Sequence, residues 1–193
     1  MNLKNYIRSI KDYPKKGILF RDITTLIKDK DAFAETINQI VERSKNFEFD
    51  KIAAIESRGF VFASAVSYIL KKPFIMLRKK NKLPADVHSI DFELEYGTAT
   101  IEVHKDSIEE NESVLIIDDL IATGGTAEAA AKLIEMSKGN VAAFIFVINL
   151  FDLGGCDKLI KNHYKIENLI EFPGHWLVAG SGIEPLTSGL WVP

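Results

Sequence analysis

Short apolar runs alternate along the chain with longer segments in which apolar residues recur every three or four positions. Strand-length runs are typical of β-strands, and the three-to-four spacing is typical of amphipathic helices. We predict strands over residues 51–57, 73–79, 99–105, 113–119, 141–150 and 164–172. We predict helices over residues 29–46, 59–72, 126–138 and 155–162, and a short first helix that ends before Pro14.

Strands that alternate with helices in this way favour parallel βαβ units, and thus a doubly wound, mainly parallel sheet flanked by helices. Two segments fit neither pattern. Residues 17–24 are predicted to form a loop or a short extended piece, and the highly charged residues 80–93 a mobile loop. We expect one domain over residues 1–175, followed by a disordered extension without a function over residues 176–193, where no period is visible.

The composition is ordinary for a globular protein, with 47% hydrophobic residues, 26% charged residues and a net charge of −3. Lysines and glutamates are mixed throughout, so the chain lacks the basic face that nucleic-acid binding requires. A single cysteine, Cys156, excludes an internal disulfide and favours a reducing compartment. No apolar run approaches the length of a membrane span. We therefore expect a cytoplasmic protein that binds neither nucleic acid nor membranes.

The stretch "VLIIDDLIATGGT", residues 114–126, leads from a buried strand through small residues into a helix. Small residues allow backbone N–H groups to approach a ligand, and the N-terminus of the helix adds positive charge, so together they suit a phosphate. Thr123 and Thr126 add hydroxyl donors. For the turn alone an equally open explanation is a tight connection, with glycine for its backbone angles and threonine as helix cap.

Two adjacent carboxylates, Asp118 and Asp119, favour the binding site over the simple turn. They repel each other, and at a strand end they gain little from packing. Carboxylates only accept hydrogen bonds, which suits a ligand rich in hydroxyl groups or a metal. The stretch has neither the lysine of a Walker A loop nor the three-glycine spacing of a dinucleotide fold. We therefore predict a site for a ribose phosphate.

These residues closely resemble the phosphoribosyl pyrophosphate (PRPP) motif of the type I phosphoribosyltransferases. Other stretches follow in the family's order and narrow the resemblance to its adenine-specific branch, the adenine phosphoribosyltransferases. They are "DYPKKGILFRDITTL" (12–26), "ESRGFVF" (56–62), "RKKNKLP" (78–84), "LEYGT" (94–98), "NLFDLGG" (149–155) and "FPGH" (172–175). The resemblance implies a homodimer that converts adenine and PRPP into AMP and pyrophosphate in purine salvage.

The resemblance also implies which residues bind PRPP. Asp118 and Asp119 would bind the ribose hydroxyls, and the family's cis peptide would fall between Glu56 and Ser57. The other implied contacts are Ala122, Thr123, Gly124, Gly125 and Thr126 at the 5′-phosphate, and Ser57, Arg58, Arg78, Lys79 and Lys82 at the pyrophosphate. Without the resemblance, "ESRG" is a charged helix start and the lysine run a solvated loop.

For adenine, the resemblance implies a pocket formed by Leu19, Phe20 and Arg21, whose backbone reads the edge of the base, with Leu120 packed on the ring. Spacing alone would place "ILF" in the core. Glu95, beside Tyr96 in a loop that closes over the substrates, would stabilise the charged sugar ring or handle the purine proton.

The implied reaction builds positive charge on the ribose and negative charge on the departing pyrophosphate. It therefore requires cations at the leaving group and fixed geometry rather than a covalent nucleophile. The expected cofactor is Mg²⁺, bound mainly through PRPP and pyrophosphate, with no protein metal site. Arg58 and the lysines would act on the same group.

Two other functions compete with adenine transfer. A 6-oxopurine enzyme of the same fold generally carries a lysine in the strand after the PRPP helix, and "AAFIFVINLFDLGG" has none before Lys158. A PRPP-sensing regulator needs a helix-turn-helix extension or a basic face, and neither is visible in the sequence.

Overall fold

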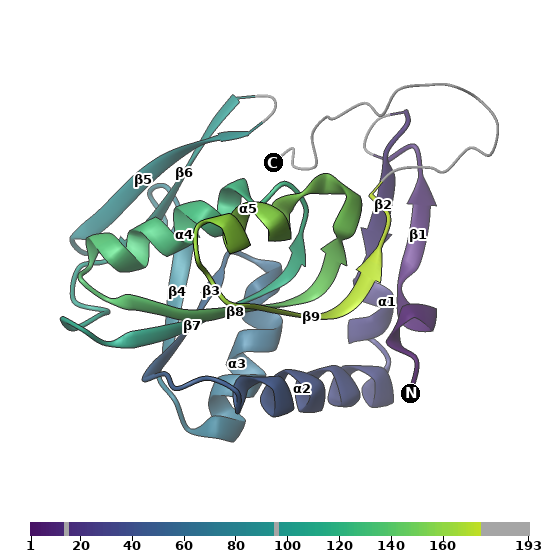
Figure 1. The fold of residues 1–193 in the computed structure, drawn as a ribbon, viewed down its shortest axis with the longest axis horizontal. Coiled ribbons are helices and arrows are strands. Elements are labelled where there is room, and N and C mark those ends of the chain that lie inside the picture. Colours follow the sequence, from purple (N-terminus) through teal and green to yellow (C-terminus); the bar gives the residue numbers. More distant parts are fainter. Residues whose placement is uncertain (14–15, 95–96, 175–193) are drawn as a thin grey trace.

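A seven-stranded sheet forms the centre of the computed structural model, which describes residues 1–13, 16–94 and 97–174. The strand order is β5-β6-β4-β3-β7-β8-β9 (Figure 1). The strands are β3 (Lys51–Ile55), β4 (Phe74–Lys79), β5 (Val87–Leu94), β6 (Gly97–His104), β7 (Ser113–Ile121), β8 (Asn140–Leu150) and β9 (Ile166–Phe172). Five of them run parallel, and the β5–β6 hairpin joins antiparallel to β4 through β6. The predicted doubly wound, mainly parallel sheet is thus confirmed.

Helices cover both faces of the sheet, as Figure 1 shows. One face carries α2 (Lys30–Ser44) and α3 (Arg58–Leu70), and the other carries α4 (Gly125–Met136) and α5 (Gly155–Lys161). The smaller elements are the 3₁₀ turns Leu3–Tyr6 and Phe151–Leu153, helix α1 (Thr24–Ile27) and an antiparallel pair, β1 (Arg8–Lys11) and β2 (Leu19–Asp22). No helix in the described ranges is long and apolar enough to cross a membrane.

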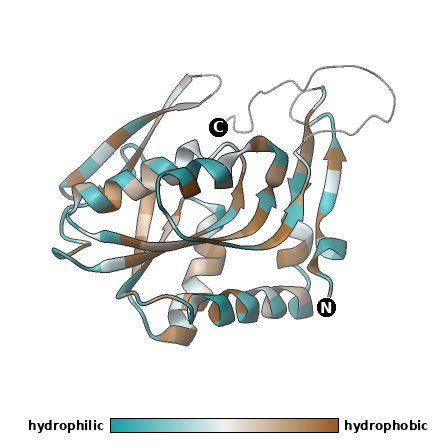
Figure 2. Cartoon of the chain, viewed as in Figure 1, coloured by the Kyte–Doolittle hydropathy of each residue, from teal (hydrophilic) through white to brown (hydrophobic). Residues whose placement is uncertain are grey.

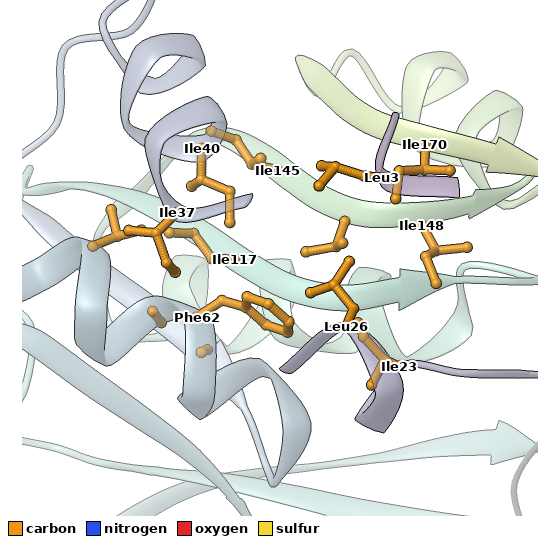
Figure 3. Close-up of a cluster of buried hydrophobic side chains, with 14 of the residues drawn as sticks. Leu3, Ile23, Leu26, Ile37, Ile40, Phe62, Ile117, Ile145, Ile148 and Ile170 are labelled. Carbon is orange, nitrogen blue, oxygen red and sulfur yellow. The ribbon is translucent and has the colours of Figure 1, made fainter. Parts of the chain in front are cut away.

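Two apolar cores fill the space between the sheet and its helices. In the core beneath α2 and α3, Ile40 and Phe62 meet Ile117 and Ile145 of the central strands, all four buried (Figure 3). Each such fully buried side chain contributes about 1.5–3 kcal/mol. Figure 2 shows the matching hydropathy pattern: the central strands are mostly apolar, while α2 has both polar and apolar residues along its length. This sheet, packed on both faces, carries the loops at its carboxyl edge.

Two predictions of local structure are wrong. The first segment is not an amphipathic helix: a single 3₁₀ turn leads into β1, which pairs with β2. Residues 80–93 are not one loop, because residues 87–94 form β5. Its alternation places Ile90 and Phe92 against the core beneath α4, a period-2 signal that the many charges obscured. Glu95, Tyr96 and the predicted extension 176–193 lie outside the described residues.

Candidate active site at the carboxyl edge of the sheet

The site lies beyond the carboxyl ends of β3 and β7, which are neighbours in the middle of the sheet. The chain leaves β3 through α3 to β4 on one side, while β7 and β8 extend the sheet on the other. Ligands of open α/β sheets bind at such a reversal of strand order. Two loops meet here: residues 56 and 57, which lead from β3 to Arg58 at the start of α3, and residues 122–124 after β7.

Asp118 and Asp119 lie near the carboxyl end of strand β7. The strand continues to Ile121 and so ends two residues later than predicted. Asp119 is 2% exposed, and its Oδ2 lies 2.9 Å from Nε of Arg58 in an ion pair. Asp118 Oδ1 accepts a hydrogen bond from the backbone N–H of Asp119 at 2.9 Å. The ion pair between Asp119 and Arg58 therefore joins the end of β7 to the first residue of α3.

Burial raises the pKa of Asp118 well above its usual value, and the neighbouring charge of Asp119 adds to this effect. Burial also raises the pKa of Asp119, although Arg58 acts in the opposite direction. Two carboxylates thus share one guanidinium in a poorly hydrated place. Such a pair favours a ligand that brings hydroxyl donors or positive charge.

Gly59 allows the acidic pair to pack against α3, a role that was not predicted from the sequence. A Cβ at this position would lie 2.7 Å from Asp118 Oδ1 and 3.1 Å from the carbonyl oxygen of Ile117. Any larger residue would push the carboxylate away. The glycine of "ESRGF" was visible in the sequence, but only the fold shows which side chain it faces.

The peptide bond between Glu56 and Ser57 is cis, as the resemblance implied. Glu56, to which no role was assigned, accepts hydrogen bonds from Arg78 Nη2 at 3.1 Å and from the backbone N–H of Lys79 at 3.0 Å. Burial acts to raise the pKa of Glu56, but these hydrogen bonds prevail and lower it. Glu56 therefore fastens the end of β4 to the loop after β3.

Arg78, Lys79 and Lys82 belong to a turn at the end of β4, but they do not share one role. The Arg78 guanidinium is bound to Glu56, and its Nη1 donates to the carbonyl oxygen of Lys82 at 3.1 Å. Lys79 and Lys82 are exposed. The structure thus makes Arg78 a support of the turn and presents the two lysines to solvent.

The loop of residues 122–124 leads into α4 through Gly124, the residue that precedes the first helical turn and has a φ of 81°. No side chain caps this end within the described chain, so the alternative in which threonine caps the helix is wrong. Thr123 is exposed and Thr126 half-buried. The first N–H groups of a helix need an acceptor, and here a ligand phosphate can supply it.

Of the predicted adenine residues, Phe20 lies close to Arg58, whose guanidinium carbon is 5.9 Å from the ring centroid, and Leu120 directly follows Asp119 in β7. Leu19 is buried, and Leu120 is half-buried against the core beneath α2 and α3. The Arg21 side chain is directed towards the segment after β9, where its Nη2 donates to the carbonyl oxygen of Pro173 at 2.9 Å. Its guanidinium also stacks on Phe172, with its carbon 4.4 Å from the ring centroid.

No group of three or more His, Cys, Asp or Glu side chains suited to a metal ion occurs among the described residues. Carboxylate oxygens are nevertheless donors of the kind that Mg²⁺ accepts, and the two aspartates supply them at the centre of the site. The donor chemistry therefore fits a cation that shares its oxygens with a ligand.

Sequence comparisons reveal relatives along nearly the whole chain. A family model described as a phosphoribosyl transferase domain matches residues 23–176. The chain is 81% identical to an adenine phosphoribosyltransferase of Pelagibacter ubique over 175 residues, which are 91% of this chain and 100% of the relative. It is 51% identical to the adenine phosphoribosyltransferase of Chlorobium phaeobacteroides, covering 90% of this chain and 99% of that one.

Solved structures show the same similarity in three dimensions. The adenine phosphoribosyltransferase of Thermoanaerobacter pseudethanolicus has a TM-score of 0.85 at 46% identity, covering 88% of this chain and 98% of that one. The enzyme of Saccharomyces cerevisiae, in complex with adenine and D-2,5-dideoxy-2,5-imino-altritol 1,6-bisphosphate, has a TM-score of 0.80 at 33% identity, with coverages of 86% and 96%.

Proposed function

The chain belongs to the phosphoribosyltransferase family, and we propose that it transfers the 5-phosphoribosyl group of PRPP to adenine, giving AMP and pyrophosphate in purine salvage. The observation that carries the proposal is the 81% identity over the full length of the Pelagibacter adenine phosphoribosyltransferase. The arrangement of the two central loops gives this reaction a physical basis.

Asp118 and Asp119 would accept hydrogen bonds from the ribose hydroxyls. A hydrogen bond to a charged group contributes about 1.5–3 kcal/mol, so two of them can fix the sugar firmly. The 5′-phosphate would sit on Ala122, Thr123, Gly124, Gly125 and Thr126, where the uncapped end of α4 supports the assignment.

The leaving pyrophosphate would lie between the loop after β3 and the turn after β4. Ser57 and Arg58 come from the first, and the exposed Lys79 and Lys82 from the second. The observed contacts of Arg78 favour a supporting role for it. Mg²⁺, the expected cofactor, would be held mainly by PRPP oxygens and would supply neutralising charge at the pyrophosphate.

Adenine would bind between Phe20 and Leu120, beside the ribose site. The Arg21 side chain is directed to Pro173 and Phe172, which favours reading of the base by the backbone of residues 19–21. Glu95, next in sequence to the last residue of β5, keeps its proposed role in stabilising the ring charge or handling the purine proton.

The proposed homodimer and cytoplasmic location rest on the family resemblance. An exposed apolar face of α3 and β4 supports the dimer, with Val61, Tyr68, Ile69 and Met76 between 37% and 86% exposed. Tyr68→Glu should yield a monomer in sedimentation experiments. Ile160→Glu, on an exposed part of α5, should leave the oligomeric state unchanged. Equal behaviour of the two variants would contradict this dimer face.

The decisive experiment measures AMP and pyrophosphate formation from PRPP and Mg²⁺ with adenine, hypoxanthine and guanine in parallel. We expect turnover with adenine alone. Turnover with hypoxanthine or guanine would favour the 6-oxopurine enzyme. PRPP binding without turnover of any base would favour a regulator.

A further inference from the structure

The turn that carries Lys79 and Lys82 is held by two carboxylates, and the second of them, Glu102, has no role in the site as proposed. Glu102 is in β6 and is 5% exposed. Its Oε2 accepts a hydrogen bond from the backbone N–H of Asn81 at 3.0 Å, and its Oε1 accepts one from Ser89 Oγ at 3.2 Å. Burying a carboxylate costs free energy unless hydrogen bonds compensate, and these two donors provide such compensation.

The strand register explains how one side chain reaches both places. Glu102 is opposite Arg78 in the β4–β6 pair and opposite Ser89 in the β5–β6 pair. Its carboxylate therefore connects the turn after β4 to the β5–β6 hairpin. In the sequence, residues 95 and 96, where Glu95 is expected to act, come between the last residue of β5 and the first residue of β6.

The turn itself needs an external support. Asn81 has a φ of 64°, in the left-handed region that residues other than glycine adopt at a cost. The turn is closed by a long bond of 3.3 Å from the Lys82 N–H to the carbonyl oxygen of Lys79. Arg78 Nη1 and the Lys80 N–H, which donates to the carbonyl oxygen of Thr100 at 3.3 Å, hold the two ends of the turn, and the Glu102 carboxylate holds its left-handed residue.

We propose that Glu102 is a positioning residue for pyrophosphate: it fixes the backbone of the lysine turn and keeps that turn in a set position relative to the β5–β6 hairpin. This inference rests on the proposed function, in which Lys79 and Lys82 face the pyrophosphate. Glu102 does not touch the substrate and acts only through Asn81 and Ser89.

The test compares Glu102→Met, which removes both acceptors at similar size, with Glu102→Gln, which can still accept from Asn81 and donate to Ser89 Oγ. In the Met variant the dissociation constant of magnesium pyrophosphate and the KM for PRPP should rise about tenfold, equivalent to ~1.4 kcal/mol. The KM for adenine should stay within about twofold, and the Gln variant should recover most of the affinity.

Asp91→Asn is the matched control, because Asp91 is an exposed carboxylate of the same hairpin that accepts from Thr100 Oγ1 at 2.6 Å. It should bind pyrophosphate normally. A folded Met variant with unchanged pyrophosphate affinity, or with equal losses for both substrates, would overturn the proposal.

If the Met variant does not fold, Ser89→Ala breaks only the link to the hairpin and should weaken pyrophosphate binding about threefold. Unchanged binding in Ser89→Ala would then overturn the proposal. Failure of the proposed function is a different result, since the wild-type protein would then form no AMP.

Discussion

The backbone N–H of Gly155 donates a hydrogen bond to the carbonyl oxygen of Ala122 at 3.0 Å, so the loop after β8 lies directly against the loop after β7. A Cβ on Gly155 would lie 2.3 Å from that oxygen and 2.8 Å from the nitrogen of Gly124. These are positions that no side chain can occupy without moving the backbone. The proposed phosphate loop therefore takes its shape partly from the second glycine of "LGG".

Gly155→Ala should displace this loop and weaken PRPP binding. Overpacking of this kind costs about 1–3 kcal/mol, which lowers the melting temperature of a protein this size by several degrees. We expect the KM for PRPP to rise about tenfold or more while the KM for adenine changes little. Steady-state kinetics with each substrate varied in turn measure both.

Gly154→Ala provides the control for backbone strain. Gly154 has a φ of 73°, but a Cβ there would meet nothing within 4 Å. The variant should lose about 1 kcal/mol of stability through the left-handed conformation, with a normal KM for PRPP. If both glycine variants bind PRPP equally well, the contact with Ala122 does not shape the phosphate site.

Asp118 should make the folded state less stable as the pH rises. Its pKa is raised in the folded protein, so its contribution is fully present below the usual aspartate pKa of about 3.9 and is lost as the pH rises through the higher folded value. Asp118→Asn cannot ionise and should melt at a higher temperature than the wild type at pH 8. The difference should shrink towards pH 4. A variant that melts lower at pH 8 would show that the charge of Asp118 stabilises the fold.

The sequence predicted the sheet and most helices because their signals are local. The apolar run of β8 and the spacing of Ile37 and Ile40 in α2 need no knowledge of distant partners. The errors occurred where pairing with a segment distant in sequence determines the local structure. Ile7 and Ile10 fit a helical spacing, yet residues 8–11 become a strand because residues 19–22 pair with them.

The same distinction applies to the site. The motif of residues 114–126 predicted, from neighbours in sequence, two acids near the end of a strand and a loop of small residues that leads into a helix. Contacts between loops were not predictable, because nothing near Glu102 in the sequence indicates that its carboxylate binds the turn after β4. For Arg21 the motif could not show that the side chain turns towards Pro173.

Base selection should survive the loss of the Arg21 side chain. If the backbone of residues 19–21 reads the 6-amino group, hypoxanthine presents an acceptor where a donor is required, and such mismatches cost roughly 10⁴-fold. Arg21→Met should raise the KM for adenine by loosening the contact with Pro173, yet keep the preference in kcat/KM. A preference that collapses in this variant would show that the guanidinium itself reads the base.

The ion pair of Arg58 and Asp119 allows the binding role of the aspartates to be separated from a structural one. Asp119→Asn leaves Asp118 as a counter-charge for Arg58 and removes the repulsion between the two acids. The melting temperature should therefore stay unchanged or rise slightly. The value of kcat/KM should fall about 10- to 150-fold, the effect of losing 1.5–3 kcal/mol at a charged hydrogen bond.

Arg58→Met should show the opposite pattern of stability, because it leaves the buried Asp119 and the half-buried Asp118 without their cation. Breaking a buried pair in this way costs up to about 3–5 kcal/mol, and the melting temperature should fall by several degrees. In the double variant, Asp119→Asn should restore part of that loss, since the second carboxylate is then absent. Thermal melts with and without Mg²⁺ and PRPP measure stability and binding together, because ligand stabilisation follows occupancy of the folded state. Should Asp119→Asn melt well below the wild type and still bind PRPP normally, the acidic pair would serve the fold and not the substrate.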